Sequence, residues 1–262
     1  MFEVTTDQMY GWIATFLWPM FRLLALIMTA PLFSESAIPR RAKVLLAAAL
    51  STIVSPTIGH IPTAQVYSFD GFLIILNEIG IGVAMGFSMR LVFAAVQMAG
   101  EVIGLQMGLS FASFYDRSAG GQTMVLSRFL NIVSMLLFLA LDGHLMMLAA
   151  LIDSFQGVPI AGVPLSGHGG GMVARAGSTV FAAGTLLALP MIAVLLTLNL
   201  SMGILNRASP QLSIFAVGFP VTLLGGMLLM LLIMPQMGVY MQHMIDAGLQ
   251  TAASVLDQLA PN

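Results

Sequence analysis

Cysteine is absent from this chain of 262 residues, and charged side chains are scarce. The absence of cysteine excludes disulfide bonds, thiolate metal sites and cysteine nucleophiles. Lys and Arg number nine and Asp and Glu eleven, so 8% of the residues are charged, against about a quarter in soluble domains. The net charge of -2 provides no basic surface for nucleic acid. The chain therefore lacks the polar surface of a water-soluble protein and the charge of a nucleic-acid-binding one.

Apolar residues make up 58% of the sequence, and the mean hydropathy is +0.97. Because a helix needs roughly 20 apolar residues to cross the hydrocarbon core, this composition predicts an all-α integral membrane protein. The first apolar run is expected to stay as an anchor, since Glu3 and Asp7 stand where a secretory signal carries basic residues. Turn-forming Gly and Pro residues separate six predicted helical segments, at residues 10–34, 42–59, 69–100, 122–152, 172–205 and 214–242.

Basic residues gather at alternate ends of these segments, after the first, third and fifth. This distribution predicts both termini on the periplasmic side, if the segments span the membrane. Segments 69–100 and 172–205 are longer than ~30 Å of hydrocarbon requires at ~1.5 Å per residue. They are expected either to kink, the second of them at Pro190, or to project beyond the bilayer. The basic residues concerned are Arg40, Arg41, Lys43, Arg117, Arg128 and Arg207.

Glycines recur at every fourth position in two places, as Gly82 and Gly86 and as Gly100, Gly104 and Gly108. Such spacing removes side chains from one helical face and lets another backbone approach closely. The face is expected to pack either against another helix of this chain or against a partner subunit.

Polar residues interrupt the apolar segments at a few positions. Arg90, Gln97 and Glu101 share one helical face because they are spaced seven and four residues apart, and Arg22 and Glu78 are lone charges within their segments. Intramembrane charges are costly and usually face protein or a water-filled cavity. These five side chains are expected either to pair between buried helices or to line a pore.

Aromatic and small residues alternate in the predicted loop at about 109–121, which contains Phe111, Phe114, Tyr115 and Asp116. Bulky rings on a flexible loop are able to form a hydrophobic constriction that excludes water and ions. Aromatic residues near a helix end also serve as ordinary interfacial anchors. From the residues alone, both interpretations stay open.

Signatures of catalysis and of cofactor binding are missing. The sequence has no H-E-x-x-H, no G-x-S-x-G and no G-x-x-x-x-G-K-[ST] motif, and its four histidines stand alone. We therefore predict no enzyme activity, no metal and no cofactor. A small-solute transporter of the common type would carry two matching halves with broken helices, and no convincing repeat is visible.

A run from 203 to 220, G-I-L-N-R-A-S-P-Q-L-S-I-F-A-V-G-F-P, closely resembles the hallmark of the FliR family, which includes the SctT-like subunits of type III secretion. The pattern is G-x-L-x-R-x-x-P-Q-x-x-I-F-x-x-G-x-P. Further matches occur in order along nearly the whole chain, although Arg117 stands where family members often place proline. The matching motif residues are Arg207, Pro210, Gln211, Gly218 and Pro220.

The resemblance implies a single export-gate domain over residues 1–262. Its long, bent helices would pack with FliP-like and FliQ-like subunits in a helical assembly that lies largely above the bilayer plane, with FlhB and FlhA as further partners. The implied place is the bacterial inner membrane at the flagellar basal body.

The implied function is to form and seal the channel through which unfolded flagellar subunits leave the cell, with the loop at about 109–121 as the plug. The loop resembles the flagellar branch of the family more than the virulence-injectisome branch, which is the alternative. A small-solute transporter is a more distant alternative.

Overall fold

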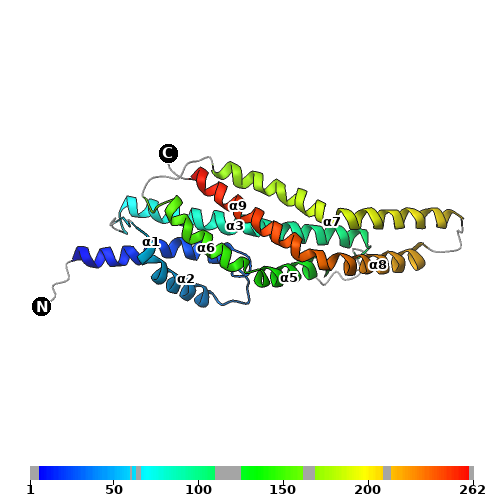
Figure 1. The fold of residues 1–262 in the computed structure, drawn as a ribbon, viewed down its shortest axis with the longest axis horizontal. Coiled ribbons are helices and arrows are strands. Elements are labelled where there is room, and N and C mark those ends of the chain that lie inside the picture. The colour runs from blue at the N-terminus through cyan, green and yellow to red at the C-terminus, as the bar shows by residue number, and fades with distance from the viewer. Residues whose placement is uncertain are drawn as a thin grey trace. The chain divides into compact units, whose positions relative to one another are not determined.

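The computed structural model describes residues 6–59, 61–62, 66–109, 125–161, 169–208 and 214–259, and every regular element in these ranges is a helix (Figure 1). This confirms the all-α prediction. Two short 3-10 turns, Ser55–Thr57 and Met234–Gln236, follow α2 and α8. The α-helices are α1 Thr6–Thr29, α2 Arg40–Val54, α3 Phe69–Gln106, α5 Val125–Ala140, α6 Gly143–Gly157, α7 Gly169–Ala208, α8 Ile214–Ile233 and α9 Met237–Leu259.

Two of the six predicted segments are interrupted. The segment predicted at 122–152 divides at Asp142, whose backbone is left-handed with a φ of 55°. The carbonyl of Asp142 accepts the first hydrogen bonds of α6, from the N–H groups of Leu145 and Met146. The segment predicted at 214–242 changes to a 3-10 turn at Pro235 and then continues as α9 to Leu259. Apolar composition runs through both breaks, so hydropathy alone does not reveal them.

Four helical stretches are long and apolar enough to cross a membrane, namely Gly11–Thr29, Phe69–Gln106, Arg175–Ala208 and Val217–Leu259. The number rises to five if α5 and α6 together form one broken span. The chain therefore has the helices of an all-α membrane protein. At ~1.5 Å per residue, the 38 residues of α3 exceed a bilayer crossing, as the sequence predicts.

The helices group into two compact units, each built from stretches that are separate in the sequence. The first contains Met1–Leu91, Asp142–Ala176 and Ile245–Asn262, and the second contains Val92–Leu141 and Gly177–Met244. The prediction of a single domain over residues 1–262 remains a prediction. The core of the first unit includes Ala14, Trp18, Val54, Ile58, Ile74, Phe155 and Ile160, and that of the second includes Val96, Ala99, Ile103, Met107, Leu126, Leu130, Ala188, Met191, Leu195 and Met237.

The end of α3 is a Schellman motif centred on Gly108. This glycine has a φ of 80°, its N–H donates to the carbonyl of Leu105 at 3.1 Å, and the N–H of Leu109 donates to the carbonyl of Gly104 at 3.0 Å. That hydrogen-bond pattern satisfies carbonyls that the last helical turn leaves without partners. Gly108, the last member of the glycine run, thus terminates the helix here and does not extend its face.

Replacing Gly108 with alanine should lower the stability of the purified protein by about 1–3 kcal/mol, because a side chain is strained at positive φ. The midpoint of thermal unfolding in detergent measures this change. The matched control is Gly177→Ala on α7, where an added Cβ meets nothing within 4 Å and alanine is the better helix former. Equal midpoints for the two variants would contradict the Schellman assignment.

Candidate functional site

Arg22 on α1 and Glu78 on α3 form a buried ion pair in the first unit. The Nε of Arg22 donates to Oε2 of Glu78 at 2.8 Å, and Nη2 donates to Oε1 at 2.9 Å. The two side chains are 0% and 1% exposed, so the pair is fully withdrawn from solvent. This parallel geometry is the strong, bidentate form of the Arg–carboxylate interaction.

The remaining contacts of the Arg22 guanidinium come from α6 and the residue after it. Nη1 donates to Oγ of Ser154 at 3.0 Å, and Nη2 also donates to the carbonyl of Val158 at 2.9 Å. The ring of Phe155 lies 4.1 Å from the guanidinium carbon, which is a cation–π contact. The cluster therefore joins three helices that are far apart in sequence, and its charges face protein.

Two glycines bring α1 and α3 close enough for this pair to form. A Cβ at Gly82 would collide with the carbonyl oxygen of Arg22, and one at Gly86 would collide with Oγ1 of Thr29. Bare backbone on one helix permits such a close approach. In this structure, Gly82 and Gly86 thus face another helix of the same chain.

A similar contact occurs in the second unit between α3 and α5. A Cβ at Gly100 would lie 2.6 Å from the Cα of Ser127, and the Ser127 hydroxyl donates to the carbonyl of Gln97 at 3.0 Å. The Gln97 side chain donates from Nε2 to Oδ1 of Asn131 at 2.8 Å. Gly104, one turn further along, is buried.

The three residues of the predicted polar stripe on α3 differ in burial, and their function in pairing or pore lining remains a prediction. Gln97 is hydrogen-bonded and partly buried, whereas Arg90 and Glu101 are exposed. Within the described residues, neither Arg90 nor Glu101 forms an ion pair.

The predicted plug loop, with Phe111, Phe114, Tyr115 and Asp116, lies outside the described residues. So do Pro210 and Gln211 of the family motif. Arg207 is exposed in the last turn of α7, and Gly218 and Pro220 lie within α8, Pro220 exposed and Gly218 partly so.

Sequence reasoning missed several contacts that the structure shows. Ser154 and Val158 lie 132 and 136 residues from Arg22 in the sequence, and neither they nor Phe155 belong to a motif. Gly184 stands alone in α7, yet a Cβ there would lie 2.7 Å from the carbonyl oxygen of Ala95. A glycine outside any repeated spacing gives no signal of this kind.

An open groove of about 490 Å³ lies between α7 and the region where α8 gives way to α9, within the second unit. Its lining is mostly apolar and includes Pro190, Gln236, Tyr240 and His243. The Tyr240 hydroxyl donates to the carbonyl of Ala183 at 2.9 Å. No group of three or more His, Asp or Glu residues in the described part of the chain has the arrangement of a metal site.

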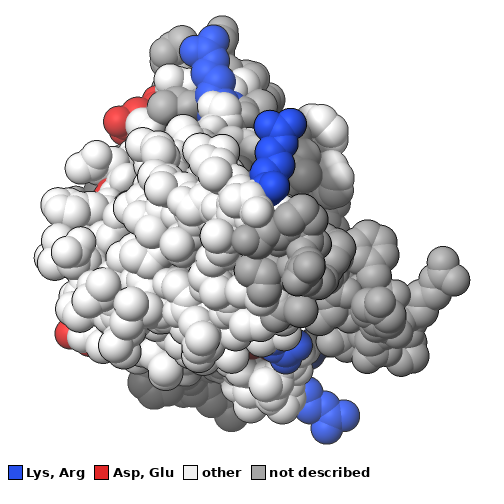
Figure 2. Space-filling model, turned by 90° about the vertical axis from the view of Figure 1, so that its right-hand side faces the viewer, with Lys and Arg blue, Asp and Glu red and all other residues white. Residues whose placement is uncertain are grey.

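Apolar side chains dominate the outside of the chain. Figure 2 shows one face on which Lys, Arg, Asp and Glu are few and lie toward the periphery. In the most apolar window of the stretch Val217–Leu259, 11% of residues are buried inside the chain, and in that of Arg175–Ala208 the share is 22%. Surface of this kind needs lipid or another subunit to cover it.

Comparison with known proteins decides the family. The model of "Bacterial export proteins, family 1" matches residues 13–248. The chain belongs to this family, the FliR family. FliR-family relatives include the flagellar biosynthetic proteins FliR of Pectobacterium carotovorum, 45% identical, and Escherichia coli, 42% identical, each with 99% of both chains covered. The FliR of Aquifex aeolicus is 30% identical, with 93% of both chains covered.

Membership of the FliR family confirms the resemblance read from the run at 203–220. The family is one of export proteins, not a known family of enzymes, which agrees with the lack of catalytic motifs. In this FliR-family chain, the buried Arg22–Glu78 cluster connects α1, α3 and α6 within the first unit.

Replacing either partner of the Arg22–Glu78 ion pair should lower the stability of the protein. Arg22→Met or Glu78→Leu alone should destabilise the protein by about 3–5 kcal/mol, because each leaves an uncompensated buried charge, whereas the double variant should be markedly more stable than either single one. Thermal unfolding of the purified variants in detergent measures the effect. Arg207→Met, which removes an exposed arginine, is the control and should change little. A double variant less stable than both single ones would refute the pairing.

Proposed function

We propose that this chain is a core subunit of the flagellar type III protein-export channel in the bacterial inner membrane. The observation that carries the proposal is the family match over residues 13–248, together with near full-length identity to proteins named as flagellar biosynthetic proteins. These names favour the flagellar branch over the injectisome branch. The match itself supports a role in the flagellar export apparatus, and the function as a channel subunit is the proposal.

The proposal includes FliP-like and FliQ-like subunits as direct partners, with FlhB and FlhA in the same apparatus. The exposed apolar faces of α7 and α8 support it, because large contiguous apolar surface marks subunit or membrane contact. Exposed large side chains there include Phe181, Leu186, Leu200, Ile204, Leu224, Leu228 and Leu231. A long helix with so little of its surface covered by its own chain is suited to an assembly.

Co-expression with the FliP-like and FliQ-like proteins of the same bacterium tests the partnership. We expect this chain to purify in one complex with both, and native mass spectrometry of the intact complex gives its composition. Co-expression with an unrelated polytopic membrane protein is the control. A chain that purifies without either partner under conditions where each partner is expressed would refute the proposal.

The proposed seal is the loop at about 109–121, with Phe111 and Phe114 as its apolar barrier. The support is the sequence resemblance and the physics of hydrophobic constrictions, which block water and ions by dewetting. In this proposal, Tyr115 and Asp116 belong to the same plug. Unfolded flagellar subunits pass when the loop retracts.

Replacing Phe111 and Phe114 together with alanine should make membranes that contain the assembled complex leak ions, because the barrier loses its bulk. Conductance across planar bilayers or ion flux from vesicles measures the leak. The matched control is Phe129→Ala with Phe181→Ala, two exposed phenylalanines on α5 and α7, which should leave the barrier intact. Unchanged conductance in a fully assembled Phe111/Phe114 variant would exclude the plug function.

A further inference from the structure

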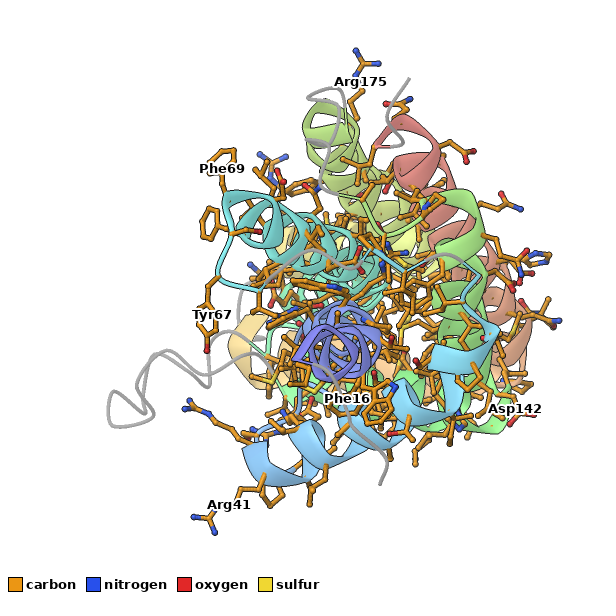
Figure 3. All side chains as sticks on the ribbon, turned by 90° about the vertical axis from the view of Figure 1, so that its left-hand side faces the viewer. Phe16, Arg41, Tyr67, Phe69, Asp142 and Arg175 are labelled. Carbon is orange, nitrogen blue, oxygen red and sulfur yellow. The ribbon has the colours of Figure 1, made fainter. Side chains whose placement is uncertain are left out.

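The loop proposed above as the seal connects two helix ends of the second unit that the structure describes. The first is the turn at 107–109 after α3, and the second is the start of α5 at Val125. Buried residues stand at both, with Met107 3% and Leu126 9% exposed. At the other end of α3, in contrast, Phe69 is 74% exposed and points outward (Figure 3). The contacts that enclose the two helix ends therefore set where the loop starts and stops.

The start of α5 is fixed directly on α3. The hydroxyl of Ser127, a residue that is 1% exposed, donates to the carbonyl of Gln97 at 3.0 Å. The Cα of the same serine lies against Gly100, where a side chain on α3 would not fit. A hydrogen bond and a close backbone contact thus hold this end of the loop to the body of α3.

The end of α3 is held by α8. The Thr222 hydroxyl donates to the carbonyl of Met107 at 3.5 Å, a long hydrogen bond, and also to the carbonyl of Phe219 in its own helix at 3.1 Å. The Met107 side chain lies across Gly226, where a Cβ would be 2.6 Å from Cγ and 2.7 Å from Sδ and Cε. Thr222 and Gly226 are four residues apart, so they share one face of α8. The turn that starts the loop is seated on this face.

The termination of α3 explains why Met107 is available for these contacts. The last carbonyls of a helix have no donor within the helix. The turn at Gly108 supplies donors for the carbonyls of Gly104 and Leu105, and the Thr222 hydroxyl supplies one for Met107. A methionine side chain is flexible enough to follow the irregular surface that a glycine leaves.

The contact with Met107 is also the most enclosed part of α8. Among residues 217–233, whose burial the structure describes, only Thr222 and Gly226 are buried, and the others are partly or fully exposed. The family motif leads directly into this contact, because Pro220 precedes Thr222 by two residues on the same helix. The part of α8 that its own chain encloses best is therefore the part that meets the start of the loop.

We propose that Thr222 and Gly226 are positioning residues of the seal. Through Met107, α8 holds the start of the loop in the place from which Phe111 and Phe114 close the channel. Phe111 follows Met107 by four residues, so a displacement of Met107 is passed on to the ring.

This inference rests on the proposed function, because it names the residues that keep the proposed seal in place. It also gives the motif at 203–220 a physical task, which is to bring α8 against the end of α3. A contact that served packing alone would affect the stability of the chain and leave the ion barrier of an assembled complex unchanged. Ion retention by the assembled complex is therefore the measurement that separates the two.

Gly226→Leu is the first test, because the added side chain needs the space that Met107 occupies. The variant is assembled with its partners and reconstituted into vesicles, and its ion retention is compared with that of the unchanged complex. We expect loss of ion retention. Gly225→Leu on the same helix is the matched control and should retain ions, since a Cβ there would meet Leu198 of α7 and not Met107. Full retention by an assembled Gly226→Leu complex overturns the proposal.

A size swap separates positioning from general damage to the core. In the double variant Gly226→Leu with Met107→Ala, the short side chain at 107 makes room for the leucine, and the carbonyl of residue 107 is again able to reach Thr222. We expect this double variant to recover the ion retention that Gly226→Leu alone has lost. A double variant that leaks as much as the single one contradicts positioning through Met107, because simple damage would grow when the methionine is also removed.

Thr222→Val is the second test, and it does not depend on whether a leucine is tolerated at position 226. Valine has the branched shape of threonine but no hydroxyl, so the change removes the hydrogen bond to Met107 with little change in volume. We expect a leak smaller than that of Gly226→Leu. Thr197→Val is the control, because Thr197 is exposed on α7 and its hydroxyl donates within its own helix, to Ala193. Equal ion retention by Thr222→Val and the unchanged complex refutes the assignment of Thr222.

The complex with Phe111→Ala and Phe114→Ala is measured beside these variants, and native mass spectrometry checks that all complexes have the same composition. If the phenylalanine variant leaks and Gly226→Leu retains ions, the positioning inference is wrong and the proposed seal stands. If neither leaks, the proposed seal itself is wrong. Leaks from both, with recovery in the size swap, support the proposal.

Discussion

The pairing of Arg22 with Glu78 is the interaction on which the first unit depends. In an apolar chain each of these charges alone would cost several kcal/mol to bury, and together they satisfy each other through two short hydrogen bonds. The pair forms only where α1 and α3 approach closely, which Gly82 and Gly86 permit. Ser154 and the carbonyl of Val158 complete the arginine's contacts, so the same charge also fixes the position of α6 and the residue after it.

The general character of the fold could be predicted from the sequence, and its breaks could not. Apolar runs of sufficient length identify the helices because the hydrocarbon thickness is known. The left-handed turn at Asp142 and the 3-10 turn at Pro235 lie inside apolar runs. Hydropathy does not change at these positions, so it does not reveal that the helix is interrupted there. Gly108 belongs to a regular glycine spacing, yet its positive φ ends the helix, and spacing alone does not separate these two uses of glycine.

Some of the site residues could likewise be predicted from the sequence, and others could be found only in the structure. Arg22 and Glu78 stand out in the sequence as intramembrane charges, because such charges are rare and costly. Their mutual contact joins positions 56 residues apart and needs the tertiary structure. Ser154, Phe155 and Gly184 are ordinary residues in an apolar helix, and only their neighbours make them important. The motif at 203–220, in contrast, identifies the family without any structure, since its order of residues is specific.

The internal neutralisation of Arg22 and Glu78 has a consequence for timing. A subunit whose buried charges needed a partner for neutralisation would be unstable from its insertion into the membrane until that partner arrived. Here the chain supplies both charges and the remaining hydrogen-bond acceptors itself. A newly made copy is therefore able to fold this part early and wait, so the order in which subunits are synthesised need not follow the order in which they join.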